Sequence, residues 1–329
     1  MTYHLPPIES WTDWTRTYND ISLWRPVVAA LCASEGIRFQ RIERPRSNTN
    51  AVFILDCRLV VKIYSPFWSE YDIEPKLIEV LTAEGTVPVP KIIASGRYQD
   101  RATWPYLVIE HRTGATLESL RPELSHEELM FIATQVGALT KALHETEIDK
   151  LEGSDAGETW DELVDRRRRE VLPELVDRGL TTSDVTKTLA GILDDVIDDS
   201  GSRPRVIVHG DLESDHVLLS RTDGQWRVSA IIDFGDAWVG ARDYEWMPLW
   251  LGLFDRNIDE MRAFLKSYDP TLLADQALPR RIIAWTLLHD FGTDAISELL
   301  QRINTPTPIK TFDELSNIVW PGLTDITQT

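Results

Sequence analysis

Two short triplets, each containing an aspartate, constrain the fold of this chain more than any other feature. His209-Gly210-Asp211 follows the apolar run Val206–Val208, and Asp233-Phe234-Gly235 ends a second apolar run. The two aspartates are 22 positions apart, and residues 216–220 and 226–234 predict a β-hairpin between the triplets. An aspartate after a strand is common, so either triplet alone would be weak evidence for a catalytic site. Both triplets, in this order and with this hairpin, are strong evidence for one.

This arrangement indicates transfer of a phosphate group from a nucleotide to a hydroxyl group. Such a reaction needs one carboxylate that accepts or orients the hydroxyl proton and a second that holds magnesium against the phosphates. Asp211 fits the first role and Asp233 fits the second. The alternative is a strand-turn-strand segment that only resembles such a site.

A lysine lies inside an apolar strand upstream, in the segment Val60-Val61-Lys62-Ile63-Tyr64. The pattern is typical of a lysine that contacts the α- and β-phosphates of a nucleotide. The alternative is a solvent-facing lysine on an edge strand. Glu74, on the next predicted helix, is the candidate partner of Lys62, and Glu79 is its rival. A glutamate in the first turn of a helix can also be favoured by the helix dipole alone.

The rest of the chain predicts a β-rich part that gives way to an α-rich part near residue 112. Predicted strands are 37–43, 51–55, 58–64 and 104–111, with a tight turn at Asp56-Cys57. Predicted helices are 8–35 (one or two), 70–83, 160–176, 183–197, 279–291 and one that opens at the capping box Ser125–Glu128. The run Arg166–Arg169 predicts a solvated or salt-bridged helix face.

Composition narrows the classes of partner. The 329 residues carry a net charge of −19, which argues against nucleic acid or an anionic membrane surface as the main partner. A cationic small molecule would suit this charge, as would a plain, well-solvated acidic surface. The two cysteines have no metal-ligand spacing, and we see neither a signal peptide nor an apolar stretch that could span a bilayer. We therefore expect a cytoplasmic protein.

Taken together, these residues resemble the aminoglycoside phosphotransferase family, the small-molecule branch of the protein-kinase-like fold. The matching segments cover nearly the whole chain and include VVKIY, VPVPKII, WPYLVIEHRTGATL, HGDLESDHVLL and IIDFGDAWVGARDYEW. LLHDF (287–291) and the tail ELSNIVWPGL look like features of hygromycin B phosphotransferases. The resemblance implies an α+β, two-lobe fold: a nucleotide-binding lobe (1–112) with N-terminal helices and a small antiparallel β-sheet, and a larger, mainly helical lobe (113–329) with the catalytic loop and acceptor site.

The resemblance also implies roles for individual residues, with ATP or GTP and Mg²⁺ as cofactors. Asp211 would be the catalytic base, with His209 supporting its loop. Lys62 would hold the phosphates, Glu74 would hold Lys62, and Asp233 would chelate magnesium. The remaining nucleotide contacts would come from Ser47, Asn48 and Thr49 over the phosphates, and from the segment Leu107–Arg112, with Glu110, His111 and Arg112, beside the base.

Two positions depart from the family pattern. His216 stands where most members have asparagine as a second magnesium ligand; a histidine nitrogen suits softer metals better. His216 is thus a candidate metal ligand, and the alternative is that it only hydrogen-bonds the loop. Glu245 replaces an aspartate of the family and is not expected to be catalytic.

The function expected from the sequence is phosphorylation of a hydroxyl on an aminoglycoside-like antibiotic such as hygromycin B, conferring resistance. Acidic residues that could line the acceptor pocket are Asp243, Asp290, Asp294 and Glu298, and the alternative for each, which the sequence favours, is surface charge. The alternatives are a kinase of an endogenous amino alcohol or sugar, and a non-catalytic nucleotide-binding protein. The choice between ATP and GTP and the oligomeric state stay open.

Overall fold

The computed structural model of the chain describes residues 4–45, 49–67, 71, 73–151 and 158–322. These residues form two compact units. The first unit contains the described residues of Met1–Gly114 and Lys150–Gly157, together with Ser229–Asp236; the second contains Ala115–Asp149, Glu158–Val228 and the described residues of Ala237–Thr329. The first unit therefore includes the Asp233 triplet. The single boundary expected near residue 112 would instead assign this triplet to the α-rich part of the chain.

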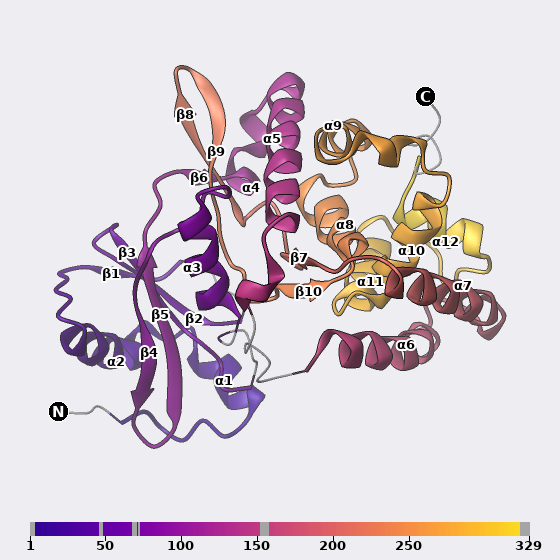
Figure 1. The fold of residues 1–329 in the computed structure, drawn as a ribbon. Helices are drawn as coiled ribbons and strands as arrows, with labels where there is room; N and C mark the ends of the chain where they lie inside the picture. Colours follow the sequence, from indigo (N-terminus) through magenta and orange to yellow (C-terminus); the bar gives the residue numbers. More distant parts are fainter. Residues whose placement is uncertain (1–3, 46–48, 68–70, 72, 152–157, 323–329) are drawn as a thin grey trace. The chain divides into compact units, whose positions relative to one another are not determined.

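The first unit is built on a five-stranded antiparallel sheet with the strand order β1-β2-β3-β5-β4 (Figure 1). The strands are β1 Ile42–Glu43, β2 Ala51–Leu55, β3 Leu59–Ile63, β4 Ile92–Gln99 and β5 Thr103–Glu110. In the centre of the sheet, Lys62 of β3 is paired with Val52 on one side and with Leu107 on the other. The small antiparallel sheet expected from the sequence is therefore present.

The first strand is shorter than its sequence predicts. Of the predicted strand 37–43, only Ile42 and Glu43 pair with β2. The turn residue Asp56 explains the difference, because its carboxylate accepts hydrogen bonds from the backbone N–H groups of Gln40 and Arg41 at 2.7–3.1 Å. Those donors are thus bound by a side chain and not by a neighbouring strand.

Two N-terminal helices, α1 Trp11–Thr17 and α2 Ile21–Ser34, cover one face of this sheet. Trp14 and Trp24 from these helices pack with Trp104 of β5, with ring centroids 5.6–6.0 Å apart. All three side chains are almost completely buried. Large aromatic side chains bury much apolar surface, so this cluster is a main contact between the helices and the sheet.

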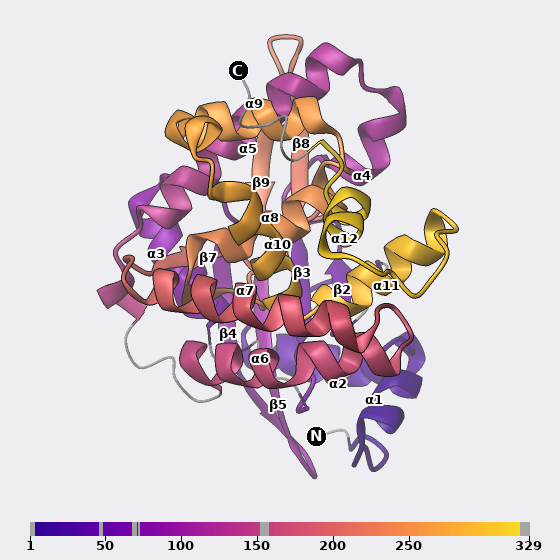
Figure 2. The ribbon, with the colours of Figure 1, turned by 90° about the vertical axis from the view of Figure 1, so that its right-hand side faces the viewer.

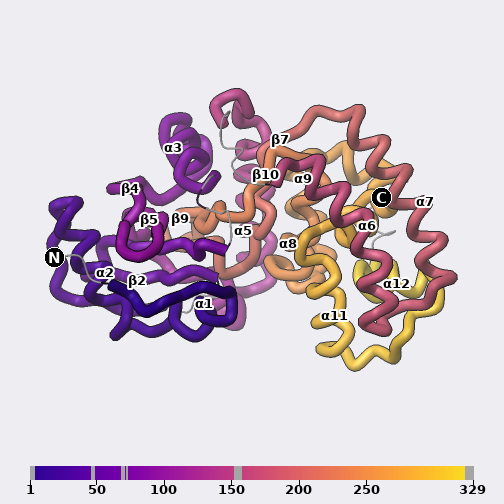
Figure 3. The backbone as a smooth tube through the Cα atoms, turned by 90° about the horizontal axis from the view of Figure 1, so that it is seen from below, coloured from indigo at the N-terminus to yellow at the C-terminus, as the bar shows by residue number. Residues whose placement is uncertain are grey.

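The helix α3 Glu74–Glu84 lies on the opposite side of the sheet from α1 and α2 (Figure 3). Successive side chains of a strand point to opposite faces. Val61 and Ile63 accordingly pack into the core beneath α1 and α2, whereas Lys62 contacts Glu74 of α3. The alternation of the strand thus selects the face on which the lysine lies.

The second unit contains two small pieces of sheet. The strands β7 Val206–Val208 and β10 Trp238–Gly240 pair antiparallel, and β6 Ala115–Thr116, β8 Val217–Thr222 and β9 Gln225–Ile231 form a three-stranded sheet in the order β6-β8-β9. The predicted hairpin between the two triplets is therefore β8 and β9. From Ser229 onward, β9 belongs to the first unit.

Helices make up most of the second unit. They are α4 Leu117–Leu120, α5 His126–His144, α6 Trp160–Asp177, α7 Ser183–Gly201, α8 Trp246–Pro248, α9 Ile258–Tyr268, α10 Leu278–Leu288, α11 Gly292–Arg302 and α12 Phe312–Val319. The predicted capping box of Ser125 and Glu128 opens α5. A Cβ on Gly137 of α5 would lie 2.5 Å from the carbonyl oxygen of Phe264, so glycine permits the close approach of α9. Helices α6 and α7 lie side by side (Figure 2).

The predicted helix 279–291 ends earlier, at Leu288. His289 has extended backbone angles, and its side chain contacts the carbonyl of Gly210, far away in the sequence. The next helix begins at Gly292, where a Cβ would lie 2.0 Å from the carbonyl oxygen of Thr286. The helix therefore ends before LLHDF is complete, at the residue that makes this tertiary contact. No helix among the described residues is long and apolar enough to cross a membrane.

Candidate active site

Lys62 is almost completely buried in the central strand of the first unit. Its Nζ atom donates to Oε2 of Glu74 and to Oδ1 of Asp233, both at 2.7 Å. Because Lys62 is 5% exposed and β3 lies between β2 and β5, the alternative of a solvent-facing edge lysine is wrong. Two carboxylates compensate the buried ammonium, which is what a charge in this position requires.

Glu74, the first residue of α3, is also buried. Its Oε2 atom accepts a second hydrogen bond, from the hydroxyl of Tyr64 at 2.6 Å. Burial raises the pKa of Glu74, while the charge of Lys62 and the hydrogen bonds from Lys62 and Tyr64 oppose this rise. The rival residue Glu79 is exposed on the same helix. Sequence reasoning missed Tyr64, although its position two residues after Lys62 was a usable signal for a shared strand face.

Asp233 follows β9 in a left-handed backbone conformation, with φ at 67°. Aspartate and asparagine adopt this region more readily than other side chains do. The next residue, Phe234, is fully buried, and the N–H of Ile231 donates to the carbonyl of Pro88 at 2.8 Å. The side chain of Asp233 is nevertheless 43% exposed. Its carboxylate thus contacts the buried lysine and is also accessible to a cation from solution.

The predicted loop over the phosphates is only partly described. Ser47 and Asn48 lie outside the described residues, and Thr49 uses its carbonyl to accept a hydrogen bond from Nε1 of Trp14 at 2.7 Å. Its neighbour Asn50, which sequence reasoning missed, is buried and accepts from the N–H of Ser65 at 3.1 Å. This contact ties the start of β2 to the chain that follows β3.

The segment expected beside the base, Leu107–Arg112, is the last part of β5 and the two residues after it. The N–H groups of Glu110 and His111 donate to backbone carbonyls within the first unit, at 2.9 and 2.8 Å. The guanidinium of Arg112 donates to the carbonyl of Ser229 at 2.9 Å. These two N–H groups are therefore already bound, and a base would need other backbone groups of this segment.

In the second unit, the loop after β7 holds Asp211 through its backbone. The N–H of His209 donates to Oε2 of Glu245 at 2.7 Å, and His209 is completely buried. The N–H of Asp211 donates to Nδ1 of His209 at 3.3 Å, and the carbonyl of Gly210 lies 2.9 Å from Nε2 of His289. Three side chains therefore hold the loop. The Asp211 carboxylate is 27% exposed, and its Oδ2 atom lies 3.7 Å from Nδ1 of His216.

His216 also contacts this loop. Its Nδ1 atom lies 2.6 Å from the carbonyl oxygen of Asp211, and a carbonyl can only accept, so Nδ1 carries a proton. Nε2 lies 3.6 Å from Oδ1 of Asp215 and is the nitrogen that could bind a metal. Among the described residues, no three histidine, cysteine, aspartate or glutamate side chains are grouped so that they could hold a metal ion.

Glu213, two residues after Asp211, adds negative charge beside this loop and was missed by sequence reasoning. Partial burial raises the pKa of Glu213, and the nearby carboxylates of Asp215, Glu298 and Glu118 raise it further, while His216 lowers it. A Cβ on Gly252 would lie 2.4 Å from the Glu213 carboxyl carbon, so glycine leaves room for this side chain. The local negative charge would attract a cation.

Three of the four acidic residues that the sequence offered for the acceptor pocket have partners in the protein. Asp243 is buried and binds Nε of Arg281 at 2.6 Å, so it is not a surface charge. Asp290 binds Arg166 at 3.0 Å, and Asp294 binds Arg178. Of the four candidates, only Glu298 is associated with the acidic group around Glu213.

A cavity of about 630 Å³ lies at the opposite end of β7 from Asp211, next to Val206. Its basic side chains are each paired with a carboxylate: Lys141, Arg203, Arg205, Arg242 and Arg281. At about 3.3 Å per residue, β7 places this cavity roughly 10 Å from the loop. The cavity is therefore separate from the Asp211 loop.

Comparisons with known proteins find sequences that are similar to this chain. The model of the phosphotransferase enzyme family matches residues 38–282 of the chain. Viomycin phosphotransferase from Streptomyces vinaceus is 27% identical over 154 residues, which are 46% of this chain and 51% of the relative. The match thus spans about half the length of this curated relative.

Solved structures resemble nearly the whole chain. The GDP complex of wild-type aminoglycoside 2'-phosphotransferase-IIIa has a TM-score of 0.63 at 16% identity and covers 92% of this chain and 98% of that chain. A thermostable mutant of aminoglycoside phosphotransferase APH(4)-Ia, in a ternary complex with ADP and hygromycin B, has a TM-score of 0.54 at 18% identity and covers 91% and 97%. At these identities the similarity shows the fold, and the expected α+β, kinase-like fold is confirmed.

Proposed function

Because the chain belongs to the phosphotransferase enzyme family, we propose that it transfers the terminal phosphate of ATP or GTP to a hydroxyl of a cationic, aminoglycoside-like antibiotic. The observation that carries this proposal is the pair of 2.7 Å contacts from Lys62 to Glu74 and to Asp233. A lysine held by a helix glutamate, next to the aspartate of a DFG triplet, is the arrangement that kinase-like phosphotransfer requires.

The nucleotide would bind to the first unit. Lys62 would contact its phosphates, and Asp233 offers the hard carboxylate oxygen that Mg²⁺ prefers. The 43% exposure of the Asp233 side chain supports this role, since a cation could reach it. When bound, magnesium would neutralise part of the phosphate charge. Related structures that contain GDP or ADP support a nucleotide as the phosphate donor.

The hydroxyl that receives the phosphate would bind to the second unit, beside Asp211. The carboxylate of Asp211 would accept or orient the hydroxyl proton. The loop contacts of His209 would keep this carboxylate in place. Nε2 of His216 is the candidate ligand for a further metal ion, with its Nδ1–H still bound to the loop.

The acceptor would be a cation. Glu213 and its acidic neighbours beside the loop support this charge preference, as does the net charge of −19. Viomycin phosphotransferase and the hygromycin B complex supply the first compounds to test. Phosphorylation of such an antibiotic in the cytoplasm would confer resistance.

The test is a panel of acceptors, assayed for nucleotide consumption and for the mass of the phosphorylated product. The panel contains viomycin, hygromycin B and kanamycin, together with an amino alcohol and a neutral sugar. We expect magnesium-dependent phosphorylation of at least one cationic antibiotic, at a rate at least about a hundredfold lower with Asp211→Asn. Phosphorylation of only the amino alcohol or the sugar would overturn the assignment of the acceptor. Tight nucleotide binding without any product would favour a non-catalytic protein.

A further inference from the structure

The peptide bond that leads into Asp211 has both of its polar atoms bound by histidine side chains. Its carbonyl oxygen, which belongs to Gly210, lies 2.9 Å from Nε2 of His289. Its N–H group, which belongs to Asp211, donates to Nδ1 of His209 at 3.3 Å. A carbonyl oxygen can only accept, so Nε2 of His289 is the donor.

We propose that His289 is a positioning residue for phosphate transfer, which fixes the Gly210–Asp211 peptide and thereby the direction of the Asp211 carboxylate. The effect of His289 on catalysis rests on the proposed function. Gly210 has φ at 78°. Glycine adopts this conformation readily, but many other backbone conformations of glycine have similar energy. The glycine alone does not fix the peptide plane, so an external hydrogen bond is needed to fix it.

The surroundings of His289 keep it in a single chemical state. The N–H of Phe291 donates to Nδ1 at 3.2 Å, which leaves the proton on Nε2. The side chain is completely buried, and burial lowers the pKa of His289 to about 3, with the charge of Arg167 acting in the same direction and the hydrogen bond to Gly210 opposing it. His289 is therefore a permanent neutral donor, which does not exchange the proton of the reaction.

Tyr244 connects this donor to the other anchor of the loop. The rings of Tyr244 and His289 stack with centroids 4.1 Å apart and planes 20° apart. The N–H of Asp290 donates to the Tyr244 hydroxyl at 3.2 Å. The next residue, Glu245, accepts from the N–H of His209 at 2.7 Å. Two consecutive residues thus support both histidines that hold the peptide.

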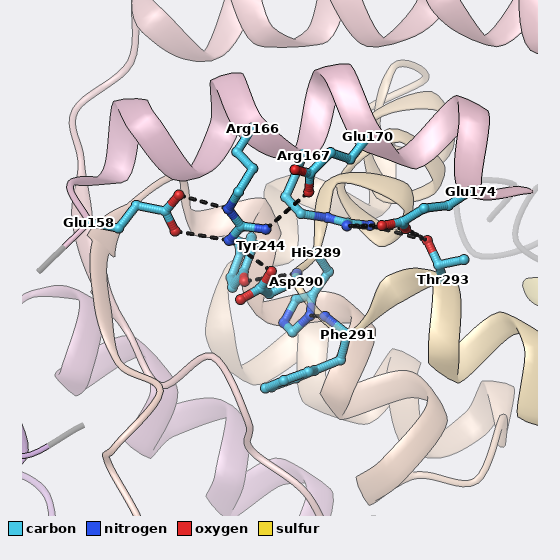
Figure 4. Close-up of polar contacts among 10 residues, drawn as sticks. All are labelled: Glu158, Arg166, Arg167, Glu170, Glu174, Tyr244, His289, Asp290, Phe291 and Thr293. Carbon is cyan, nitrogen blue, oxygen red and sulfur yellow. Dashed lines mark hydrogen bonds and ion pairs between the residues drawn. The ribbon is translucent and has the colours of Figure 1, made fainter. Parts of the chain in front are cut away.

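Two consecutive arginines of α6 hold the turn that carries His289 (Figure 4). Arg166 binds Oδ1 of Asp290 at 3.0 Å, and the buried Arg167 donates to Oγ1 of Thr293 at 3.1 Å. These contacts lie directly after His289 in the chain. Part of the run Arg166–Arg169 is therefore a clamp on this turn, and Arg169 is exposed on the same helix.

The experiment compares His289→Phe with His289→Gln. Phenylalanine keeps an aromatic ring against Tyr244 but removes the donor, whereas the glutamine amide can donate from nearly the position of Nε2. One readout is hydrogen exchange of the Asp211 amide, which does not depend on activity. The second is the kinetics of phosphorylation with a separate measurement of nucleotide affinity. Arg166→Ala and the exposed Arg169→Ala form a matched pair for the clamp.

We expect His289→Phe to speed exchange of the Asp211 amide at least tenfold and to lower kcat about ten- to a hundredfold, with nucleotide affinity unchanged. This is the scale of a catalytic group displaced by about 1 Å. His289→Gln should recover most of both losses. Arg166→Ala should show a smaller loss in kcat, and Arg169→Ala none. Unchanged exchange and unchanged kcat in His289→Phe would overturn the proposal.

Two further outcomes distinguish failure of this proposal from failure of the proposed function or of the variant to fold. If no acceptor is phosphorylated but Asp211 exchange responds as expected, the hydrogen-bond assignment stands and the proposed function fails. If His289→Phe does not fold, ¹⁵N-histidine spectra of the unsubstituted protein decide the matter. We expect a neutral His289 with its proton on Nε2 between pH 5 and 9, as burial requires. A protonated ring or a proton on Nδ1 would overturn the proposal.

Discussion

Nζ of Lys62 lies 2.7 Å from Oδ1 of Asp233, although the two residues are 171 positions apart in the chain. Both belong to the first compact unit, whereas Asp211 belongs to the second. The groups proposed for the phosphates are thus assembled within one unit, and the group proposed for the hydroxyl lies in the other. Substitutions should therefore separate nucleotide binding from turnover.

The pair of Glu74 and Lys62 should stabilise the fold as well as the nucleotide site. Glu74→Gln removes one of two carboxylates from a buried ammonium, which should cost up to about 3 kcal/mol of unfolding free energy, because Asp233 still compensates Lys62. Nucleotide affinity should fall at least about tenfold, since Lys62 loses a charge-assisted hydrogen bond that orients it. Denaturant unfolding and calorimetric titration measure the two effects.

Glu79→Gln is the matched control, because Glu79 lies on the same helix but is exposed. It should change the unfolding free energy by less than about 0.5 kcal/mol. Equal effects of the two substitutions would contradict the pairing of Glu74 with Lys62.

Asp233→Asn should weaken nucleotide binding only when magnesium is present. Asparagine tolerates the left-handed backbone at φ 67° and can still accept from Lys62, so the change removes mainly the charge that would hold the cation. Titrations with magnesium and with a chelator should then give similar affinities for the variant. If magnesium still tightens binding as much as in the unsubstituted protein, Asp233 is not its ligand.

Asp211→Asn should lower turnover at least about a hundredfold, the scale of general-base removal. The hydrogen bonds of Asp211 to the loop come from its backbone N–H and carbonyl, and asparagine keeps the shape of the side chain that lies 3.7 Å from His216, so folding and nucleotide affinity should be nearly unchanged. Asp223→Asn, in the exposed turn between β8 and β9, is the control for loss of a negative charge. Near-normal turnover of Asp211→Asn on its best acceptor would refute the role.

Local patterns in the sequence predicted the elements that local interactions determine. The capping box of Ser125 and Glu128 opens α5, and Glu74, the candidate partner of Lys62 only 12 positions away, contacts it. Where the structure differs from the predicted elements, contacts between residues that are distant in the sequence are involved. The carboxylate of Asp56 shortened the first strand, and the contact of His289 with Gly210 is associated with an earlier end of the helix 279–291.

The same limit applies to the candidate site. The triplets made Asp211 and Asp233 candidates because their type and spacing carry chemical information. His289 contacts a residue 79 positions away, and no local pattern indicates such a contact. Asp243 shows the opposite error, because its charge suggested an acceptor contact but Arg281 binds it in the interior. Charge in a sequence does not reveal whether a partner is already present.

The two interpretations of His216 can be separated because its two nitrogens have different surroundings. Nδ1–H donates to the Asp211 carbonyl, and an asparagine amide could replace this donor. His216→Asn should therefore keep the loop in place, while its hard oxygen shifts the metal preference from manganese towards magnesium. His216→Leu should lose at least about tenfold in turnover with either metal, because a part-buried carbonyl is left without its donor. The same ratio of magnesium to manganese rates in His216→Asn would leave only the loop role.

The Glu213 carboxylate should lower the stability of the folded protein but strengthen binding of a cationic acceptor. Partial burial and neighbouring carboxylates raise its pKa above the ordinary value of 4.5, so the folded protein binds this proton more tightly than the unfolded chain does. Ionisation of Glu213 in the folded protein therefore costs stability, and this cost disappears as the pH falls through the raised pKa. Glu213→Gln should therefore melt at a higher temperature than the unsubstituted protein at pH 7.

The advantage of Glu213→Gln should shrink as the pH approaches 4.5, where the original carboxyl is increasingly protonated. The same substitution should raise KM for a cationic acceptor, because a negative charge beside the Asp211 loop is lost, and leave KM for the nucleotide unchanged. Glu118→Gln, an exposed neighbour, should not change the melting temperature. Melting curves at several pH values and acceptor kinetics test both parts. A pH-independent difference in melting temperature would show that ionisation of Glu213 is not its cause, and an unchanged acceptor KM would remove Glu213 from the acceptor site.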